Sequence, residues 1–291
     1  MHLLNADLHS HSLFSDGTLS PEDVATRAFE QGVDIWALTD HDELAGQRRA
    51  RDAALALGMD YLSGTEISVS FAGETVHILG LGVDINNAAL LAGLAATRGG
   101  RRERAQQMAD GLAQVGINGA FDGALRYVSN PDLISRTHFA RFLVDTGVCP
   151  DTHSVFRRYL TPGHPGYVPH AWAKLGDAVR WIREAQGVAV IAHPARYRFC
   201  ATAEYALFTE FIAHGGLGVE VMTGSHSHSE QVKYGQTAQE FGLLASRGSD
   251  FHSPQESRVD LGEVPDLPGT LRPVWGALQH RIQRAHHKTS A

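Results

Sequence analysis

The sequence predicts an α/β fold in which a parallel sheet, closed or nearly closed into a barrel, is covered by helices. Apolar strand-like segments alternate with amphipathic helical segments along most of the 291 residues. About seven such strands are expected, which suits a barrel better than a six-stranded open sheet. One region, 90–169, breaks the alternation because it is helical, basic and rich in turns. We therefore expect a barrel formed by 1–89 and 170–291, with 90–169 as a helical insertion over one end.

The first strand and the first helix have the clearest local signals. A short apolar segment, 3–9, is expected as a strand. The helix that follows is expected over 20–32, because Ser20 suits the N-terminal cap and Gly32 is a natural stop. The next apolar segment, 33–42, is expected as a buried strand that ends in polar residues.

The same order of strand and helix then recurs to the end of the chain. Further strands are expected at 60–71, 74–83, 188–194, 217–222 and 243–252. Further helices are expected at 49–58, 175–187, 204–216 and 227–242. Alternation of this kind is typical of parallel strands joined by helical crossovers.

Composition narrows the class of protein. The formal net charge of −7 argues against a basic surface that binds long nucleic acid. Two cysteines, Cys149 and Cys200, are too few for a disulfide framework and indicate free thiols in a reducing compartment. No basic leader and no apolar stretch of about 20 residues is present, so we expect a cytoplasmic protein without a membrane partner.

Histidines are abundant, at 17 of 291 residues, and several stand at predicted strand ends. His9 and His11 alternate along one strand, so both side chains point to the same face. Asp250 and His252 repeat this spacing in the last strand. The other ligand-type residues at strand ends or in the first loop are Asp16, His41, Glu66, His77 and His193.

Any one of these histidines, taken alone, is more often a capped or solvated residue than a metal ligand. Their convergence changes that balance, since parallel strands of a barrel all end on one face, where active sites are built. Imidazole and carboxylate ligands together suit Mn²⁺, Zn²⁺ or Fe²⁺. Nine ligands are too many for one ion, so two or three divalent ions are expected.

The run from Asp7 to Asp42, "DLHSHSLFSDGTLSPEDVATRAFEQGVDIWALTDHD", resembles the polymerase and histidinol phosphatase (PHP) family within the wider amidohydrolase group. The later segments "GTEIS", "VHILG", "IAHP" and "SDFH" match in order. This resemblance implies a distorted (β/α)7 barrel, similar to a TIM barrel, that holds three divalent ions, with Mn²⁺ favoured.

The resemblance also implies a ligand set for each ion. The first ion is assigned to His9, His11, Glu66 and Asp250. The second shares Glu66 and adds His77 and His193. The third is assigned to Asp16, His41 and His252. Three further carboxylates either orient imidazoles from behind the ligands or act as loop and cap residues: Asp7, Asp40 and Asp42.

Such a site suits the hydrolysis of a phosphate monoester. Clustered divalent ions lower the pKa of a bridging water, neutralise the phosphoryl oxygens and stabilise the leaving alkoxide. The sequence contains no "GxSxG" motif and no P-loop, so direct attack by a metal-bridging hydroxide is expected. The proton for the leaving group could come from His193, another site histidine or a metal-bound water.

The insertion is expected to select the substrate as a cap over the active-site end of the barrel. Each of its arginines, taken alone, suits a solvated helix face, but their grouping favours anion binding. The predicted substrate-binding residues are Arg101, Arg104, Ser135, Arg136, Thr137, His138, Ser225 and His226, and Arg196 and Arg198 follow His193. A second anion pocket beside the metals indicates a substrate with two phosphates.

The insertion and its "SRTHFA" stretch most resemble the branch of the family that removes the 3′-phosphate of nucleoside 3′,5′-bisphosphates and leaves a 5′-monophosphate. The expected partner is therefore a small nucleotide. The alternatives are a 5′→3′ exoribonuclease on short oligonucleotides, a histidinol-phosphate phosphatase and a metal-stabilised module without catalysis. The many arginines count against histidinol phosphate, whose amine would favour carboxylates. Base preference and oligomeric state are not predicted.

Overall fold

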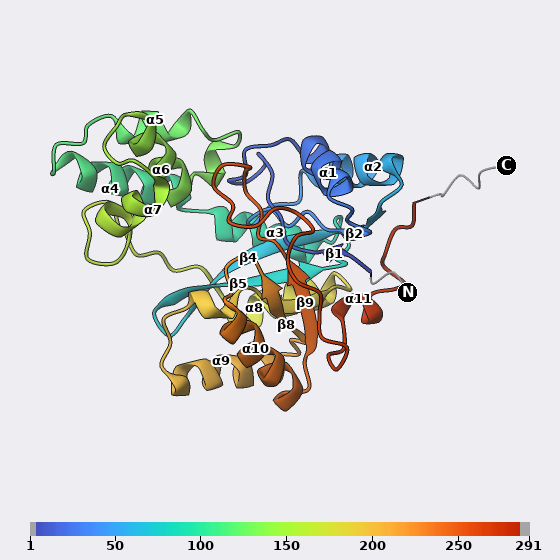
Figure 1. The fold of residues 1–291 in the computed structure, drawn as a ribbon. Helices are drawn as coiled ribbons and strands as arrows, with labels where there is room; N and C mark the ends of the chain where they lie inside the picture. Colours follow the sequence, from blue (N-terminus) through green and yellow to red (C-terminus); the bar gives the residue numbers. More distant parts are fainter. Residues whose placement is uncertain (1–3, 286–291) are drawn as a thin grey trace.

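Two sheets form the centre of the computed structural model, which describes residues 4–285 (Figure 1). One sheet has the order β1-β2-β3, and the other has the order β6-β4-β5-β7-β8-β9. The strands are β1 (Ala6–Asp7), β2 (Ile35–Trp36), β3 (Asp60–Tyr61), β4 (Gly64–Phe71), β5 (Glu74–Leu81), β6 (Ala173–Lys174), β7 (Val188–Ile191), β8 (Gly218–Thr223) and β9 (Leu244–Gly248). The mixed α/β class is confirmed. Leu3, the first residue of the strand expected at 3–9, lies outside the described residues.

Backbone hydrogen bonds join the two sheets at two places. Beside β1, the N–H of Leu8 donates to Arg247 O at 3.0 Å and the N–H of Asp250 donates to His9 O at 2.9 Å. Beyond the end of β2, the N–H of Asp42 donates to Glu66 O, on β4, at 2.8 Å. Within residues 4–285 the strands nevertheless form two sheets rather than one closed ladder, so the predicted closed barrel is not confirmed.

The expectation of an all-parallel sheet is wrong at β5. This strand pairs antiparallel with both β4 and β7. The cause is the connection between β4 and β5, which consists of Ala72 and Gly73 with φ of 47° and 84°. Two residues of positive φ form the tight turn of a β-hairpin, whereas a parallel crossover needs a dozen residues or more. The segments expected at 60–71 and 74–83 already left no room for a helix between them.

Helices cover the outer faces of the sheets. The helices that alternate with strands are α1 (Pro21–Glu30), α2 (Gln47–Leu57), α8 (Leu175–Glu184), α9 (Ala201–Ala213), α10 (His228–Glu240) and α11 (Val274–Ala277). The first begins as expected, since the hydroxyl of Ser20 accepts a hydrogen bond from the N–H of Asp23. In the part of the chain that the structure describes, no helix is both long and apolar enough to cross a membrane.

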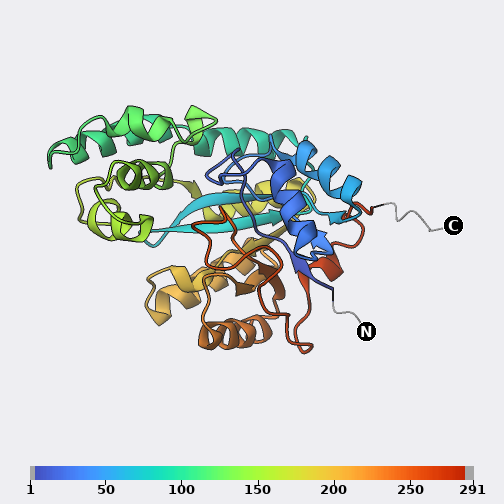
Figure 2. The same ribbon diagram turned by 45° about the horizontal axis from the view of Figure 1, so that its top comes forward.

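A helical group separates β5 from β6 and lies to one side of the sheets (Figure 2). It comprises α3 (Ala88–Arg98), α4 (Arg101–Ala113), α5 (Ala120–Leu125), η1 (Pro131–Leu133), α6 (Arg136–Asp145), α7 (Thr152–Val155) and a π-helical turn, η2 (Phe156–Leu160). The segment from α4 onward has an apolar core of its own that includes Met108, Leu112 and Phe139. By contrast, Leu90 and Leu94 of α3 pack in the core of the main sheet.

The close approach of β9 to β1 gives a prediction on stability. A Cβ atom added at Gly248 would lie 2.4 Å from His9 Cβ and 2.6 Å from the His9 backbone nitrogen. We expect Gly248→Ala to lower the free energy of unfolding by about 1–3 kcal/mol, the usual cost of overpacking. Urea denaturation measures this change.

Gly269→Ala is the matched control, because a Cβ there meets nothing within 4 Å. If the two variants proved equally stable, the close contact between β9 and His9 would be contradicted.

Candidate active site

Nine ligand-type side chains meet beside the ends of β1, β2, β7 and β9, and two of them lie within strands rather than at the expected strand ends. His9 and His11 follow β1, and their Nε2 atoms lie 3.1 Å apart, as their spacing predicts. Glu66 lies on β4 and His77 on β5. The remaining members follow β2, β7 or β9 or lie in the loop before α1: Asp16, His41, His193, Asp250 and His252. Residues far apart in the sequence therefore converge on one place.

These side chains form three overlapping ligand groups, each with its ligand atoms within 4.8 Å of one another. Group 1 contains His9, His11, Glu66 and Asp250; group 2 contains His41, Glu66 and His77; and group 3 contains His11, Asp16, His41 and His252. His193, which was expected in group 2, lies with its Nε2 atom 3.0 Å from Glu66 Oε1. The groups thus share Glu66, His11 and His41.

The unpaired polar atoms of the site fit bound cations. Asp16 Oδ1, His41 Nδ1, Glu66 Oε2 and His77 Nδ1 are buried and have no hydrogen-bond partner among the described residues. Asp16 Oδ1 lies 3.3 Å from His252 Nε2, and Glu66 Oε2 lies 3.0 Å from His41 Nδ1. His77 Nδ1 lies 2.9 Å from Glu66 Oε1. Buried polar atoms that face one another without hydrogen bonding require another partner. Their nitrogen and oxygen chemistry suits Mn²⁺, Zn²⁺ or Fe²⁺.

The electrostatics of the site also favour positive charge. Burial alone raises the pKa of Glu66, but His41 and His77 outweigh burial and hold that pKa well below its usual range. Asp16 and Asp250 behave in the same way, each beside imidazoles that lower its pKa. Three ionised carboxylates that are largely shielded from water attract cations strongly.

His193 and His41 have lowered pKa values, whereas carboxylate neighbours raise the pKa values of His9 and His11. Burial, together with the charge of Arg196, lowers the pKa of His193 to about 3. A neutral imidazole suits a metal ligand, whereas the proposed role as proton donor requires the protonated form. The backbone of His193 is also unusual, with φ of 25°, and Asp42 and Asp250 have φ of 50° and 57°. Non-glycine residues rarely adopt such angles, and outside tight turns these angles often mark functional sites.

Of the two alternatives for the three further aspartates, their contacts favour loop and cap residues over groups that orient imidazoles. Asp40 accepts hydrogen bonds from Ser12 and Ser15, and Asp42 accepts them from Ser68. Asp7 accepts bonds from backbone N–H groups, those of Ser249 and Gly262 among them. These carboxylates therefore fix the loops that carry the ligands, because short polar side chains readily bond nearby backbone groups.

The carboxylate that does contact an imidazole from behind is Glu220, which the sequence analysis missed. Its Oε1 atom lies 3.0 Å from His9 Nδ1. The available signal was a charged residue in the middle of the otherwise apolar strand "LGVEVM". A buried charge in a strand needs a specific partner, and this rule could have identified it.

A pocket of about 130 Å³ lies over the ligand groups. Of the predicted substrate-binding residues, Arg101, Arg104, Ser135, Arg136 and Thr137 line it. Ser225 lines an adjoining hollow of about 340 Å³ that shares Thr137, Phe156, Arg196, Asp250 and His252 with the first.

His138 and His226 line neither hollow. The Nδ1 atom of His138 accepts the N–H of Ser135, and both ring nitrogens of His226 lie within hydrogen-bonding distance of backbone atoms. Arg198 is exposed and also lies outside the two hollows.

The arginines of the pocket differ in their partners. Arg101 pairs with Asp42 and lies over the Trp172 ring, with its guanidinium carbon 4.4 Å from the ring centroid. Arg104 and Arg136 have no carboxylate partner among the described residues and donate to backbone carbonyls. Burial and the charges of its arginine neighbours lower the pKa of Arg104 to about 10. Guanidinium groups that are buried, as in Arg104, or half-buried, as in Arg136, and that lack a carboxylate partner favour an anionic ligand.

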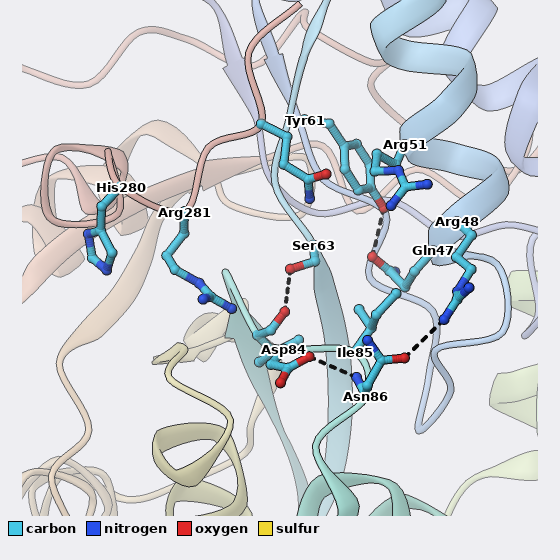
Figure 3. A pocket seen from close by; sticks show the side chains of 12 residues that line it. Gln47, Arg48, Arg51, Tyr61, Ser63, Asp84, Ile85, Asn86, His280 and Arg281 are labelled. Carbon is cyan, nitrogen blue, oxygen red and sulfur yellow. Dashed lines mark hydrogen bonds between the residues drawn. The ribbon is translucent and has the colours of Figure 1, made fainter.

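A larger hollow, of about 450 Å³, lies elsewhere, beside α2 and the C-terminal segment (Figure 3). It contains none of the nine ligand-type residues. Several of its polar side chains are already paired: Tyr61 donates to Gln47, and Arg48 donates to Asn86. The smaller pocket over the ligand groups is therefore the candidate active site.

Comparison with known proteins agrees with this geometry. Residues 7–128 match the family model described as the PHP domain. A Chromobacterium violaceum protein named 3′,5′-nucleoside bisphosphate phosphatase is 51% identical over 282 residues, covering 97% of this chain and 99% of its own. A Haemophilus influenzae protein named 5′-3′ exoribonuclease is 38% identical over 269 residues, covering 92% of this chain and 97% of its own.

Solved structures show the same similarity. A Chromobacterium violaceum protein described as an amidohydrolase, with bound sulfate and no metal, superposes with a TM-score of 0.95 at 51% identity, covering 98% of this chain and all of that one. A Bifidobacterium adolescentis protein described as a putative metal-dependent phosphoesterase gives a TM-score of 0.80 at 28% identity, covering 95% and 96% of the two chains. The shared fold, the shared sequence and the convergent ligand groups lead to one conclusion: the chain belongs to the PHP-domain family, and it is a phosphoester hydrolase.

Proposed function

We propose that this enzyme removes the 3′-phosphate of nucleoside 3′,5′-bisphosphates and releases phosphate and a nucleoside 5′-monophosphate. The observation that carries the proposal is the pocket in which three ligand groups lie beside Arg104 and Arg136, two guanidinium groups without a carboxylate partner. One phosphate would bind at the ligand groups and the second at these arginines. The name of the Chromobacterium violaceum relative supports this substrate class.

Three divalent cations, with Mn²⁺ favoured, are part of this proposal. The residues that would hold them are those of the three ligand groups together with His193. Divalent cations bound there would supply activation of water and stabilisation of the phosphoryl and leaving-group oxygens. The two oxygens of Glu66 face different imidazoles, Oε2 toward His41 and Oε1 toward His77, so one carboxylate would serve two groups.

The chain's own residues would then orient the substrate. Arg104 and Arg136 would neutralise the 5′-phosphate, and Thr137, whose hydroxyl donates to Asp16 at 3.0 Å, stands between them and group 3. We further propose that the two sheets act together as a distorted barrel and that 90–169 is its substrate-binding cap. The cap would fix the distance between the two phosphates and thereby favour substrates with two phosphates over those with one.

One observation favours a second activity, 5′→3′ exoribonuclease action on short oligonucleotides. The adjoining hollow of about 340 Å³ shares five residues with the pocket over the ligand groups, which leaves room for a longer substrate. The Haemophilus influenzae relative is named for this activity. Incubation with a labelled oligoribonucleotide distinguishes the exoribonuclease from the bisphosphate phosphatase. Stepwise shortening of the oligonucleotide from its 5′ end would indicate the exoribonuclease, because that activity requires an open channel.

Metal dependence tests the ligand groups. We expect Glu66→Gln to reduce phosphate release from adenosine 3′,5′-bisphosphate by about 100-fold or more, since even residues behind the ligands contribute 10- to 100-fold in metal sites. Chelation of the native protein would abolish release, and added Mn²⁺ would restore it. Chromatography would identify the product as AMP with a 5′-phosphate.

Glu240→Gln, at an exposed position on α10, is the control and is expected to keep full activity. Rapid hydrolysis of histidinol phosphate without hydrolysis of the bisphosphate would overturn the proposed substrate.

Removal of a pocket arginine tests substrate selection. We expect Arg136→Met to raise KM for adenosine 3′,5′-bisphosphate by about 10-fold or more, the effect of a charge-assisted contact worth about 1.5–3 kcal/mol. The KM for p-nitrophenyl phosphate, which has no second phosphate, would change little. Steady-state kinetics on both substrates measure the difference.

Arg126→Met removes an exposed arginine outside the pocket and serves as the control. Equal changes in KM for both substrates would place Arg136 outside the contact with the second phosphate.

A further inference from the structure

Glu220 is a buried carboxylate that belongs to none of the three ligand groups but contacts residues of the site directly. It lies in the middle of β8, whose six residues are all buried, between Val219 and Val221. Its exposed fraction is 0%. A carboxylate in such surroundings is costly unless each oxygen receives a hydrogen bond, so its partners indicate why it is there.

Both oxygens of Glu220 contact residues that carry ligand atoms. Oε1 lies 3.0 Å from His9 Nδ1, and Oε2 accepts the backbone N–H of His193 at 2.7 Å. His9 belongs to group 1, whereas His193 lies beside Glu66 on the side of group 2. One carboxylate therefore holds two ligand residues that are 184 positions apart in the sequence.

The contact with His9 determines which ring nitrogen faces the ligand group. Since Glu220 accepts the proton on Nδ1, the lone pair of His9 lies on Nε2. That atom lies 3.3 Å from both Glu66 Oε2 and Asp250 Oδ1. Glu220 thus selects the tautomer that can bind a cation in group 1.

The contact with His193 holds an unfavourable backbone conformation. His193 has φ of 25° and ψ of 59°, and Pro194 follows it. Its N–H points to Glu220 Oε2, and its side chain then reaches Glu66 Oε1. A strained ligand residue persists only where its surroundings fix it, and this hydrogen bond is one such constraint.

A bulge in β8 aims Glu220 at both partners. The pairing of β8 with β9 shifts register between Glu220 and Met222, which face Ser246 and Arg247. A bulge bends the strand locally and redirects a side chain, and bulges are frequent beside active sites.

We propose that Glu220 is a positioning residue that links group 1 to His193, on the side of group 2. It does so by fixing the His9 tautomer and the His193 backbone at once. This inference rests on the proposed metal-dependent activity, but it concerns cation binding and not the choice of substrate.

The test is the isosteric variant Glu220→Gln, compared with Glu240→Gln. The substituted amide has one oxygen, so it can accept only one of the two N–H groups. If its NH₂ group faces His9, it donates to Nδ1 and favours the tautomer with the proton on Nε2, which cannot bind a cation there. We expect Mn²⁺ to bind about 10- to 100-fold more weakly, as metal content after equilibrium dialysis measures. Glu240→Gln would bind Mn²⁺ as the unmodified protein does, and the thermal midpoint of the metal-free Glu220→Gln protein would show that it is folded.

A measurement on the unmodified protein covers the case in which the variant does not fold. In Zn²⁺-loaded protein with ¹⁵N-labelled histidine rings, NMR would show a protected Nδ1–H on His9 and a metal-bound Nε2. Binding of the metal through Nδ1 of His9, or wild-type Mn²⁺ affinity in Glu220→Gln, would overturn the inference. Glu220→Gln could bind Mn²⁺ more weakly while the unmodified protein hydrolyses no bisphosphate. That result would support the inference on Glu220 and contradict the proposed function.

Discussion

The arrangement of the site depends on one buried carboxylate, Glu66, which is fully enclosed and faces five imidazoles. Oε2 lies 3.0–3.3 Å from one nitrogen each of His9, His11 and His41, and Oε1 lies 2.9–3.0 Å from nitrogens of His77 and His193. A charge in such surroundings is tolerated only where positive charge compensates it. The strands around Glu66 consequently end in side chains that bind either protons or cations.

The loops around the ligands follow from the same constraint. Ligand residues must hold their atoms in a small volume, and two of them, His193 and Asp250, do so with backbone angles that non-glycine residues rarely adopt. Asp7, Asp40 and Asp42 accept hydrogen bonds from Ser249, Ser12 and Ser68 and thereby hold the adjoining segments in place. The helical group between β5 and β6 then adds guanidinium groups on the open side, where an anion would approach the cations.

Sequence reasoning predicted the meeting of His9 and His11 because alternation along a strand fixes side-chain direction. It also predicted the mixed α/β class and the cap at Ser20, since these are local signals. It was wrong on the direction of β5, where a two-residue turn outweighed the general rhythm of strand and helix. Glu220 and the roles of the three aspartates depend on contacts between distant segments, and one sequence alone does not specify which partner each buried carboxylate finds.

The adjacency of β1 and β9 places a requirement on biosynthesis. The residues of group 1 come from both ends of the chain, His9 near its beginning and Asp250 near its end. A nascent chain on the ribosome therefore lacks a complete group 1 until almost all of the protein has been made, and the long separation between these residues makes their pairing a late event. Completion of group 1 in this way waits for the synthesis of Asp250, whereas the members of group 2 are all present once His77 has been made.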